Sequence, residues 1–243
     1  MLDNLVILIT NAEHFVGPCS ADVLAGHGAN VICHDVTFSD AAARDAFVAA
    51  HPGVVAAEAT EPEALAAEVI AAYGRIDVLI CNDAYPAVRA PVDEAEAAEM
   101  DRALQSLVVW PFRLISAVVP AMKERGAGKI LMITSAAPIR GLANYSMYAT
   151  ARGAGNAMVK SLSLELAPHN IQVNAIAPNY IENPTYFPPE LLANEKAMTK
   201  MLSNIPAKRL GKPEEVAETI AFFASNRCGF ITGHVVPIAG GWA

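Results

Sequence analysis

Short apolar runs rich in β-branched residues recur along this chain, and alanine-rich segments of helical length separate most of them. Strands that alternate with helices form βαβ units, and such units build a parallel sheet with helices on both faces. With 243 residues, 53% of them hydrophobic, the chain can bury one large core. The sequence therefore predicts an α/β fold, a doubly wound parallel sheet in a single domain covering residues 1–243. The six predicted strands are Leu5–Thr10, Ala29–Cys33, Val78–Cys81, Lys129–Thr134, Ile171–Ile176 and His234–Ile238.

Charge and cysteine content argue against several classes of partner. The formal net charge is −8, and no basic patch is evident that would attract nucleic acid or a membrane, so we expect neither as a partner. The four cysteines lack C-x-x-C spacing and a nearby histidine cluster, so we expect no metal site. Reduced cysteines in apolar runs are typical of a cytoplasmic protein, and a small molecule is the expected ligand.

One stretch interrupts the alternation of strands and helices. Residues 178–189 read PNYIENPTYFPP, and the following residues 190–203 could form a helix. The stretch follows a predicted strand, and ligands of open α/β sheets bind beyond the carboxyl ends of the strands. We therefore expect residues 178–205 to form a lid or pocket wall rather than a separate domain.

The loop after the first predicted strand lacks the glycines that a dinucleotide requires, which let backbone amides approach a pyrophosphate closely. Residues 10–17 read TNAEHFVG. The chain here resembles the short-chain dehydrogenase/reductase superfamily, whose loop runs T-G-x-x-x-G-x-G, and Asn11 and Phe15 stand at the first two glycine positions. The Phe15 ring would fill the volume of the diphosphate or nicotinamide ribose, and Glu13 would repel phosphates. We therefore expect no cofactor, although a nucleotide bound in a shifted pose is the alternative.

The resemblance to this superfamily runs the length of the chain. GRIDVLICNDA stands where the superfamily has a strand ending in N-A-G, KILMITSA where it has the serine strand, and ITGHVVPIAGGW at the end. These matches imply a Rossmann-like fold. Two departures are Leu107, at the place where reductases of the superfamily carry a proton-relay asparagine, and Asn179, which replaces a glycine after Pro178. Asp35 stands at the place of a ribose-binding acid and is expected to be a remnant.

Three residues suited to acid–base chemistry follow the spacing S-x(12)-Y-x(3)-R. Ser135 ends a predicted strand, and Tyr148 and Arg152 lie at i and i+4 of a predicted helix, so their side chains share a face. A tyrosine acts as a base near neutral pH only where a cation stabilises its phenolate, which the always protonated Arg152 can do. Ser135 can donate to a substrate oxygen and hold it beside Tyr148. Tyr145 is a competing base without an arginine at i+4.

The Ser-Tyr-Arg set, the aromatic residue in the glycine loop and the sequence APNYIENPTYF together resemble the halohydrin dehalogenases, a cofactor-independent family derived from this superfamily. The resemblance implies that Tyr148 deprotonates the hydroxyl of a vicinal halohydrin, whose oxygen displaces the halide to give an epoxide. It also implies the reverse opening of epoxides by azide, cyanide or nitrite.

Around the halide and substrate, the resemblance places backbone N–H groups near Tyr180 and Ile181 and the edges of aromatic rings. Position alone adds four pocket walls, Pro86, Ile139, Leu142 and Asn144. The residues implied at the halide are Phe15, Pro178, Asn179, Tyr180, Ile181, Tyr186 and Phe187.

Two other functions stay open: an NAD(P)-dependent reductase with an atypical loop, and a catalytically silent binding protein. The missing glycines argue against the first, and the combination of serine, tyrosine and arginine argues against the second. Superfamily members usually associate through long helices, so we expect a homotetramer, a dimer of dimers, formed through residues 94–123 and 148–168. Trp242 is expected to reach the pocket of a neighbouring subunit.

Overall fold

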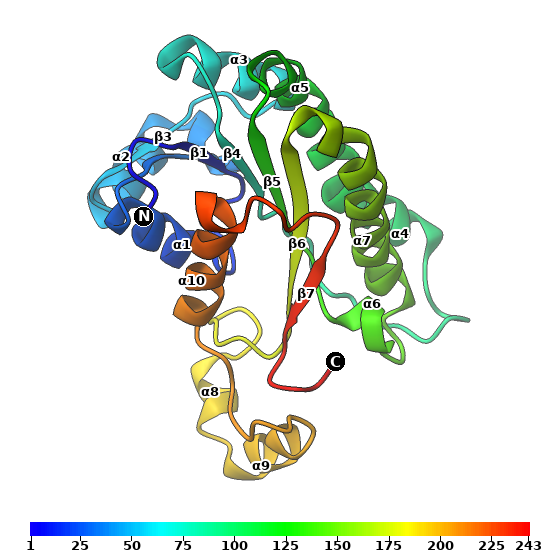
Figure 1. The fold of residues 1–243 in the computed structure, drawn as a ribbon. Coiled ribbons are helices and arrows are strands. Elements are labelled where there is room, and N and C mark those ends of the chain that lie inside the picture. The colour runs from blue at the N-terminus through cyan, green and yellow to red at the C-terminus, as the bar shows by residue number, and fades with distance from the viewer.

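Seven parallel strands form one sheet in the computed structural model, which describes residues 1–243 (Figure 1). In chain order the strands are β1 (Val6–Ile9), β2 (Asn30–Cys33), β3 (Val54–Ala56), β4 (Val78–Cys81), β5 (Gly128–Ile133), β6 (Ile171–Pro178) and β7 (Val235–Ile238). Their order across the sheet is β3-β2-β1-β4-β5-β6-β7, and every neighbouring pair is parallel. The chain winds outward from β1 to one edge and then from β4 to the other, which confirms the predicted doubly wound, Rossmann-like fold.

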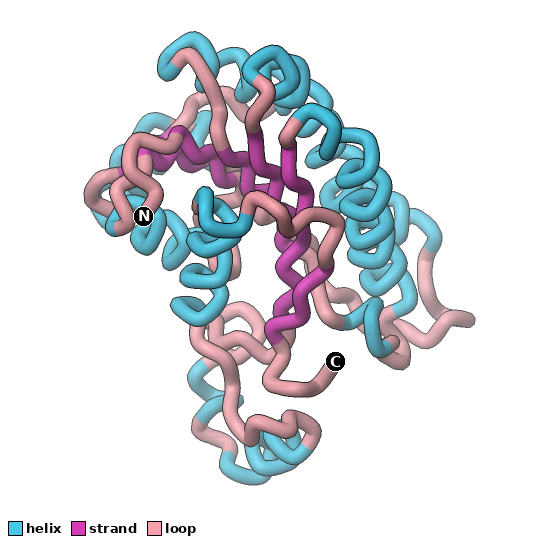
Figure 2. The backbone as a smooth tube through the Cα atoms, viewed as in Figure 1, coloured by secondary structure: helices cyan, strands magenta, loops and turns pink.

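Helices connect the strands and lie on both faces of the sheet, as Figure 2 shows in cyan around the magenta strands. They are α1 (Gly17–Gly26), α2 (Ala41–Ala50), α3 (Pro62–Tyr73), α4 (Ala97–Leu104), α5 (Trp110–Arg125), α6 (Ala137–Arg140), α7 (Ser146–Leu166), α8 (Pro189–Leu192), α9 (Glu195–Ser203) and α10 (Pro213–Ala224). A π-helical segment, Gln105–Val109, joins α4 to α5.

The two faces of the sheet bury separate hydrophobic cores, because side chains alternate along each strand. In β1, Ile7 and Ile9 belong to a core shared with α1, α2 and α10. Val6 and Leu8 belong to a second core shared with α3, α5 and α7. All four β1 residues are therefore buried, which explains why the strand is a continuous apolar run rather than an alternating one.

The six predicted strands are all present, with ends that differ by at most two residues. The edge strand β3 is an addition: it has three residues and only Val54 is buried, so its apolar run is too short to stand out. The helix expected at residues 190–203 is two helices, because Asn194 starts a new one. Its side chain accepts a hydrogen bond from the Ala197 N–H and so caps α9.

One helical run, Ala97–Arg125, is long and apolar enough by length and composition to cross a membrane. In the fold, its α5 portion buries Leu114, Ile115, Val118 and Met122 in the core on one face of the sheet. It also packs on α3. An apolar stripe of this kind is typical of a helix that covers the core of a folded domain.

The carboxyl ends of the central strands meet at one edge of the sheet, and the order of the strands reverses between β1 and β4. This is where ligands of open α/β sheets bind. The residues that follow β1, β4, β5 and β6 gather there. Beyond the same edge, α8 and α9 extend away from the sheet (yellow in Figure 1).

Candidate active site

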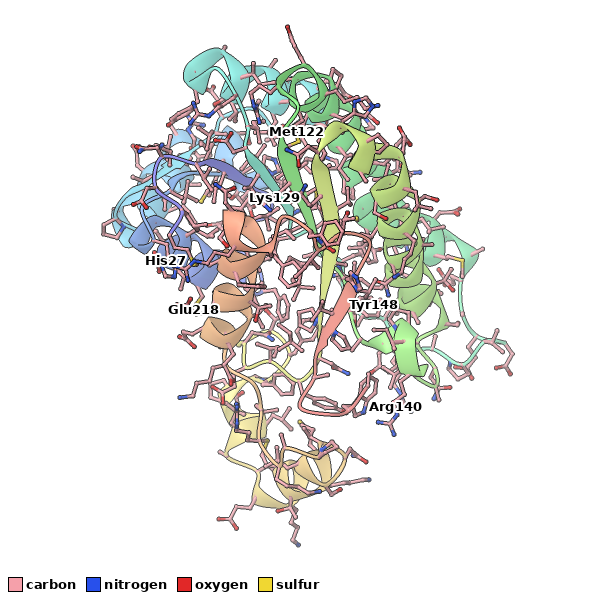
Figure 3. All side chains as sticks on the ribbon, viewed as in Figure 1. His27, Met122, Lys129, Arg140, Tyr148 and Glu218 are labelled. Atoms are coloured by element: carbon pink, nitrogen blue, oxygen red, sulfur yellow. The ribbon has the colours of Figure 1, made fainter.

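Ser135, Tyr148 and Arg152 come together at the carboxyl edge of the sheet. Ser135 follows β5 and is buried, and its Oγ accepts a hydrogen bond from the Ala137 N–H over 3.1 Å. Helix α7 carries Tyr148, labelled in Figure 3, one turn before Arg152. Arg152 Nε donates to Tyr148 Oη over 3.2 Å, and Arg152 Nη1 donates to the Ile133 carbonyl over 2.9 Å. The guanidinium is therefore anchored to the serine strand while it binds the phenol oxygen.

A cavity of about 320 Å³ opens beside Ser135 and Tyr148. Most of its lining is apolar or aromatic, and no charged side chain lines it. The other residues in its wall that the sequence singled out as halide or substrate contacts are Phe15, Leu142, Pro178, Asn179, Tyr180, Ile181, Tyr186 and Phe187.

The structure also corrects and extends this set. Pro86, Ile139 and Asn144 do not line the cavity, whereas Ala87, the neighbour of Pro86, does. Position in the loop after β4 indicates the region but not which adjacent side chain faces the cavity. Ala137, Tyr145 and Asn183 complete the wall, and only Tyr145 attracted notice in the sequence, as a competing base.

Two further cavities lack this chemistry. One, of about 310 Å³, lies at the amino edge of the sheet, where Arg125 and Lys129 line it without any tyrosine or serine. The other, of about 390 Å³, lies on the opposite side of the loop that follows β6. Its only cation, Arg209, forms an ion pair with Glu215 at 2.6 Å. Neither cavity offers a phenol held by a cation.

The 178–181 loop, which begins at the end of β6, is held by short-range hydrogen bonds. Asn179 N–H donates to the Ile238 carbonyl over 3.0 Å, and Asn179 Oδ1 accepts from the Tyr180 N–H over 2.9 Å. The Tyr180 amide that the sequence placed near a halide thus already donates within the loop, and its contact with a halide stays a prediction. The Ile181 N–H has no protein acceptor and is the free backbone donor of the loop.

Two non-glycine residues occupy left-handed positions in the loop after β1: Asn11 has φ 46° and Phe15 has φ 52°. This conformation costs an L-residue roughly 1–2 kcal/mol, and glycine avoids that cost. The Asn82 side chain supports the loop by donating to the carbonyls of Asn11 and His14 over 3.0 and 2.9 Å. The loop thus keeps left-handed backbone at two former glycine positions, while the Phe15 ring lines the cavity edge-on to Tyr186.

The carboxylate of Asp35, at the place of a ribose-binding acid, makes its hydrogen bonds within the protein. It is fully buried, and its two oxygens accept from the Glu13 N–H and the Thr37 N–H, each over 3.2 Å. Thr37 Oγ1 in turn donates to Glu13 Oε2 over 2.7 Å. The carboxylates of Asp35 and Glu13 are thus already hydrogen-bonded within the protein. Two negative charges held here disfavour binding of the ribose and phosphates of a dinucleotide.

Asp83 is a site residue that the sequence analysis missed. Its Oδ1 accepts from Asn11 Nδ2 over 2.9 Å and from Thr10 Oγ1 over 3.2 Å, whereas its buried Oδ2 has no partner. Burial raises the pKa of this carboxyl to about 7, although the Thr10 hydrogen bond and the Arg152 charge act in the opposite direction. Asp83 lines a small cavity of about 40 Å³ with Tyr148 and Arg152. The signal was a charged residue in NDA, where the superfamily has N-A-G.

Comparisons with known proteins agree with this architecture. A family model described as enoyl-(acyl carrier protein) reductase matches residues 12–243. A 3-oxoacyl-acyl-carrier-protein reductase of Thermotoga maritima is 33% identical over 99% of this chain and 98% of its own length. Both matches extend over nearly the whole chain, so they show the superfamily to which the chain belongs.

Two solved structures are similar in both fold and sequence. One, described as a dehalogenation enzyme, is 48% identical, with a TM-score of 0.97 that covers 100% of this chain and 99% of the other. A halohydrin dehalogenase bound to ethyl (2S)-oxiran-2-ylacetate is 35% identical, with a TM-score of 0.93 over 97% and 96% of the two chains. The chain therefore belongs to the short-chain dehydrogenase/reductase superfamily and, within it, is an enzyme of the halohydrin dehalogenase family.

Proposed function

We propose that the protein converts vicinal halohydrins to epoxides without a cofactor, with release of halide and a proton. The observation that carries the proposal is the Arg152–Tyr148 hydrogen bond at the wall of a cavity in which the Phe15 ring occupies the former glycine-loop position. A base activated by a cation is what deprotonation of an alcohol requires. The aromatic ring and the internally bonded Asp35 argue against a dinucleotide, the requirement of a reductase.

In the proposed mechanism, the substrate hydroxyl binds between Ser135 Oγ and Tyr148 Oη. The Arg152 charge stabilises the Tyr148 phenolate, which removes the hydroxyl proton. The substrate oxygen then forms a bond to the neighbouring carbon as the carbon–halogen bond breaks, and the halide leaves with the bonding electrons. Nucleophile and leaving group belong to one molecule, so holding the reactive conformer is the main catalytic task.

The departing halide is proposed to lie between the 178–181 loop and the aromatic rings. The free Ile181 N–H can donate to it, and the positive edges of Phe15 and Tyr186 can surround it. Asn179 and Pro178 shape the loop backbone. No ammonium or guanidinium lines the cavity, which suits weak binding and release of a monovalent anion.

The same site is proposed to run in reverse. Protonated Tyr148 then acts as a general acid on the epoxide oxygen, and azide, cyanide or nitrite attacks a ring carbon from the halide position. Each of these nucleophiles is a small monovalent anion, as a halide is. The uncharged lining, which includes Leu142 and Ala87, favours neutral substrates over carboxylated or phosphorylated ones because a buried unpaired charge is costly.

Three aspects of organisation belong to the same proposal. Residues 178–205 form a lid over the site. The enzyme is cytoplasmic, and it is a homotetramer, a dimer of dimers. Large apolar side chains that stay exposed on the proposed interface helices support association: Phe112 on α5 is 49% exposed, and Leu164 on α7 is 81% exposed.

The test is consumption of azide with a simple terminal epoxide, measured for the wild type and two matched variants. Tyr148→Phe should abolish turnover because it removes the acid and base. Tyr145→Phe, a change of one phenol in the same cavity, should keep turnover within about tenfold of the wild type because Arg152 donates its hydrogen bonds to Tyr148 and the Ile133 carbonyl rather than to Tyr145. Equal activity of Tyr148→Phe and wild type would overturn the mechanism.

A further inference from the structure

The end of the chain folds back against residues of the proposed site, on the side that does not line the cavity. After β7, Gly240 and Gly241 have φ of 57° and 83°, and the chain turns there onto the residues that follow α9. The Ala207 N–H donates to the Gly240 carbonyl over 2.9 Å. A Cβ on Gly240 would lie 2.9 Å from Ile205, so the close approach excludes a side chain. The turn fixes where the next residue, Trp242, is placed.

Trp242 packs within its own chain, which corrects the expectation that it reaches a neighbouring subunit. Its side chain is buried in a small cluster with Ala136 and Ala239. The Arg140 guanidinium lies 4.8 Å from the centroid of the indole, and Arg140 Nη1 donates to the Trp242 carbonyl over 3.3 Å. Figure 3 shows Arg140 beside the last residues of the chain.

The indole contacts both halves of the proposed site without lining its cavity. Ala136 directly follows Ser135, and its N–H donates to the Pro178 carbonyl over 3.2 Å. On the other side, the Tyr180 ring meets the indole edge-to-face with centroids 5.8 Å apart. Trp242 therefore packs against the residue next to Ser135 and against the 178–181 loop, and it does so outside the cavity wall.

The 178–181 loop needs such support because part of it is strained. Tyr180 has φ 56°, a left-handed conformation that is strained for a non-glycine residue. Strain of this kind persists where the surrounding structure holds the residue in place. The aromatic pair of Tyr180 and Trp242 and the Arg140 cation above the indole both stabilise this packing.

We propose that Trp242, held by Arg140, is a positioning residue that fixes the 178–181 loop relative to Ser135 and thereby sets the affinity of the site for its small anion. The inference rests on the proposed function, because it concerns the anion half of the same site. Trp242 does not touch the substrate, so its loss should weaken anion binding much more than it slows the chemical step.

The kinetic test uses epoxide opening by azide in the full-length protein. Trp242→Ala should raise the KM for azide and the inhibition constant for bromide by about tenfold, whereas the KM for the epoxide and kcat change by less than about threefold. Trp242→Phe should recover most of the affinity because it keeps a ring against Tyr180. Arg140→Gln removes the cation above the indole at an exposed position and should raise the azide KM by about threefold.

Trp110→Ala is the matched control, because it removes the only other tryptophan and that residue lies on α5 away from the loop. Its azide KM should equal that of the wild type. The proposal is overturned if Trp242→Ala and Arg140→Gln leave the azide KM unchanged. It is also overturned if all kinetic constants worsen in parallel, or if Trp110→Ala gives the same pattern.

Amide hydrogen exchange separates this inference from the proposed function, since it needs no turnover. In Trp242→Ala the Asn179 and Tyr180 amides should exchange faster than in the wild type, while the strands of the sheet keep their protection. Unchanged exchange in the 178–181 loop would refute the positioning role even in an active enzyme. Conversely, a wild type without activity but with this exchange response would refute the function and retain the positioning role.

Discussion

Arg152 donates to Tyr148 Oη over 3.2 Å through Nε and to the Ile133 carbonyl over 2.9 Å through Nη1. One guanidinium thus ties the proposed base on α7 to the strand that ends just before Ser135. The rigid, planar fork of arginine has donors for both contacts, whereas the single ammonium of lysine does not reproduce this geometry. The chemistry and the placement of the phenol therefore depend on the same side chain.

Substitution of Arg152 should lower turnover in a graded way. Arg152→Gln removes the charge that stabilises the phenolate and should reduce kcat by about 10²–10⁴-fold. Arg152→Lys keeps the charge but loses one of the two contacts, so its kcat should fall between those of the Gln variant and the wild type. Steady-state halide release measures both, with thermal unfolding as the control for folding. Equal loss in both variants would contradict a role for the charge.

Backbone strain at Phe15 predicts an unusual order of stability. Phe15→Gly and Phe15→Ala both lose the ring, but only glycine adopts φ 52° without strain. The Gly variant should therefore be more stable than the Ala variant by about 1 kcal/mol. Urea unfolding of the two variants measures the difference. A more stable Ala variant would show that the left-handed conformation carries no cost here.

The raised pKa of Asp83 predicts that the wild type loses stability relative to Asp83→Asn as the pH rises. Burial raises the pKa of this carboxyl from 3.8 to about 7, so the folded state favours its protonated form. Wild-type stability should fall as pH rises from about 4 to 7, as the unfolded state releases a proton that the folded state retains. Asp83→Asn removes this dependence and should gain up to about 4 kcal/mol over the wild type by pH 8.

Urea unfolding of wild type and Asp83→Asn at pH 5 and pH 8 measures this effect. Glu215 at the start of α10 provides a contrast, because the Arg209 ion pair lowers the pKa of its carboxyl to about 2. The difference in stability between wild type and Glu215→Gln should therefore be the same at pH 5 and pH 8, and should shrink only as the pH falls from about 4.5 to about 2. A pH-independent difference between wild type and Asp83→Asn would contradict the raised pKa.

The buried His34 predicts that the wild type loses stability as the pH falls. Its ring is buried and stacked on Trp110 with centroids 5.1 Å apart, and neither ring nitrogen has a hydrogen-bond partner. Burial lowers the pKa of His34, although the nearby carboxylate of Asp35 acts in the opposite direction. The unfolded state therefore takes up a proton first, and wild-type stability should fall below about pH 6.5 by up to about 1.4 kcal/mol per pH unit.

His34→Phe keeps a stacked ring that cannot be protonated. Its free energy of unfolding, measured from pH 7.5 to pH 5.5, should fall less steeply than that of the wild type. If the two proteins respond identically to acid, folding does not lower the pKa of His34.

The sequence predicted what depends on local periodicity. Six strands followed from apolar runs, and the pairing of Tyr148 with Arg152 followed from the i, i+4 geometry of a helix. The missing glycines likewise pointed to the loop at Phe15. These features need only a few consecutive residues, so a single chain reveals them.

Features that depend on tertiary packing were beyond such reasoning. The choice of Ala87 over Pro86 as a cavity wall depends on the direction of a loop side chain, which has no period. The use of the Tyr180 amide by Asn179 and the placement of Trp242 behind its own site depend on how distant segments meet. Asp83 was visible as a charge after a buried strand, but its unpaired oxygen beside Arg152 was not.

The most direct test of the central claim is release of halide and protons from 1,3-dichloro-2-propanol in buffer without any nicotinamide, together with titration of NADH and NADPH. The account predicts equal amounts of chloride, protons and epoxide, and no binding of either dinucleotide. No chloride release, together with tight NADPH binding, would contradict it, because the Phe15 ring would then leave the dinucleotide site open and the protein would be a reductase.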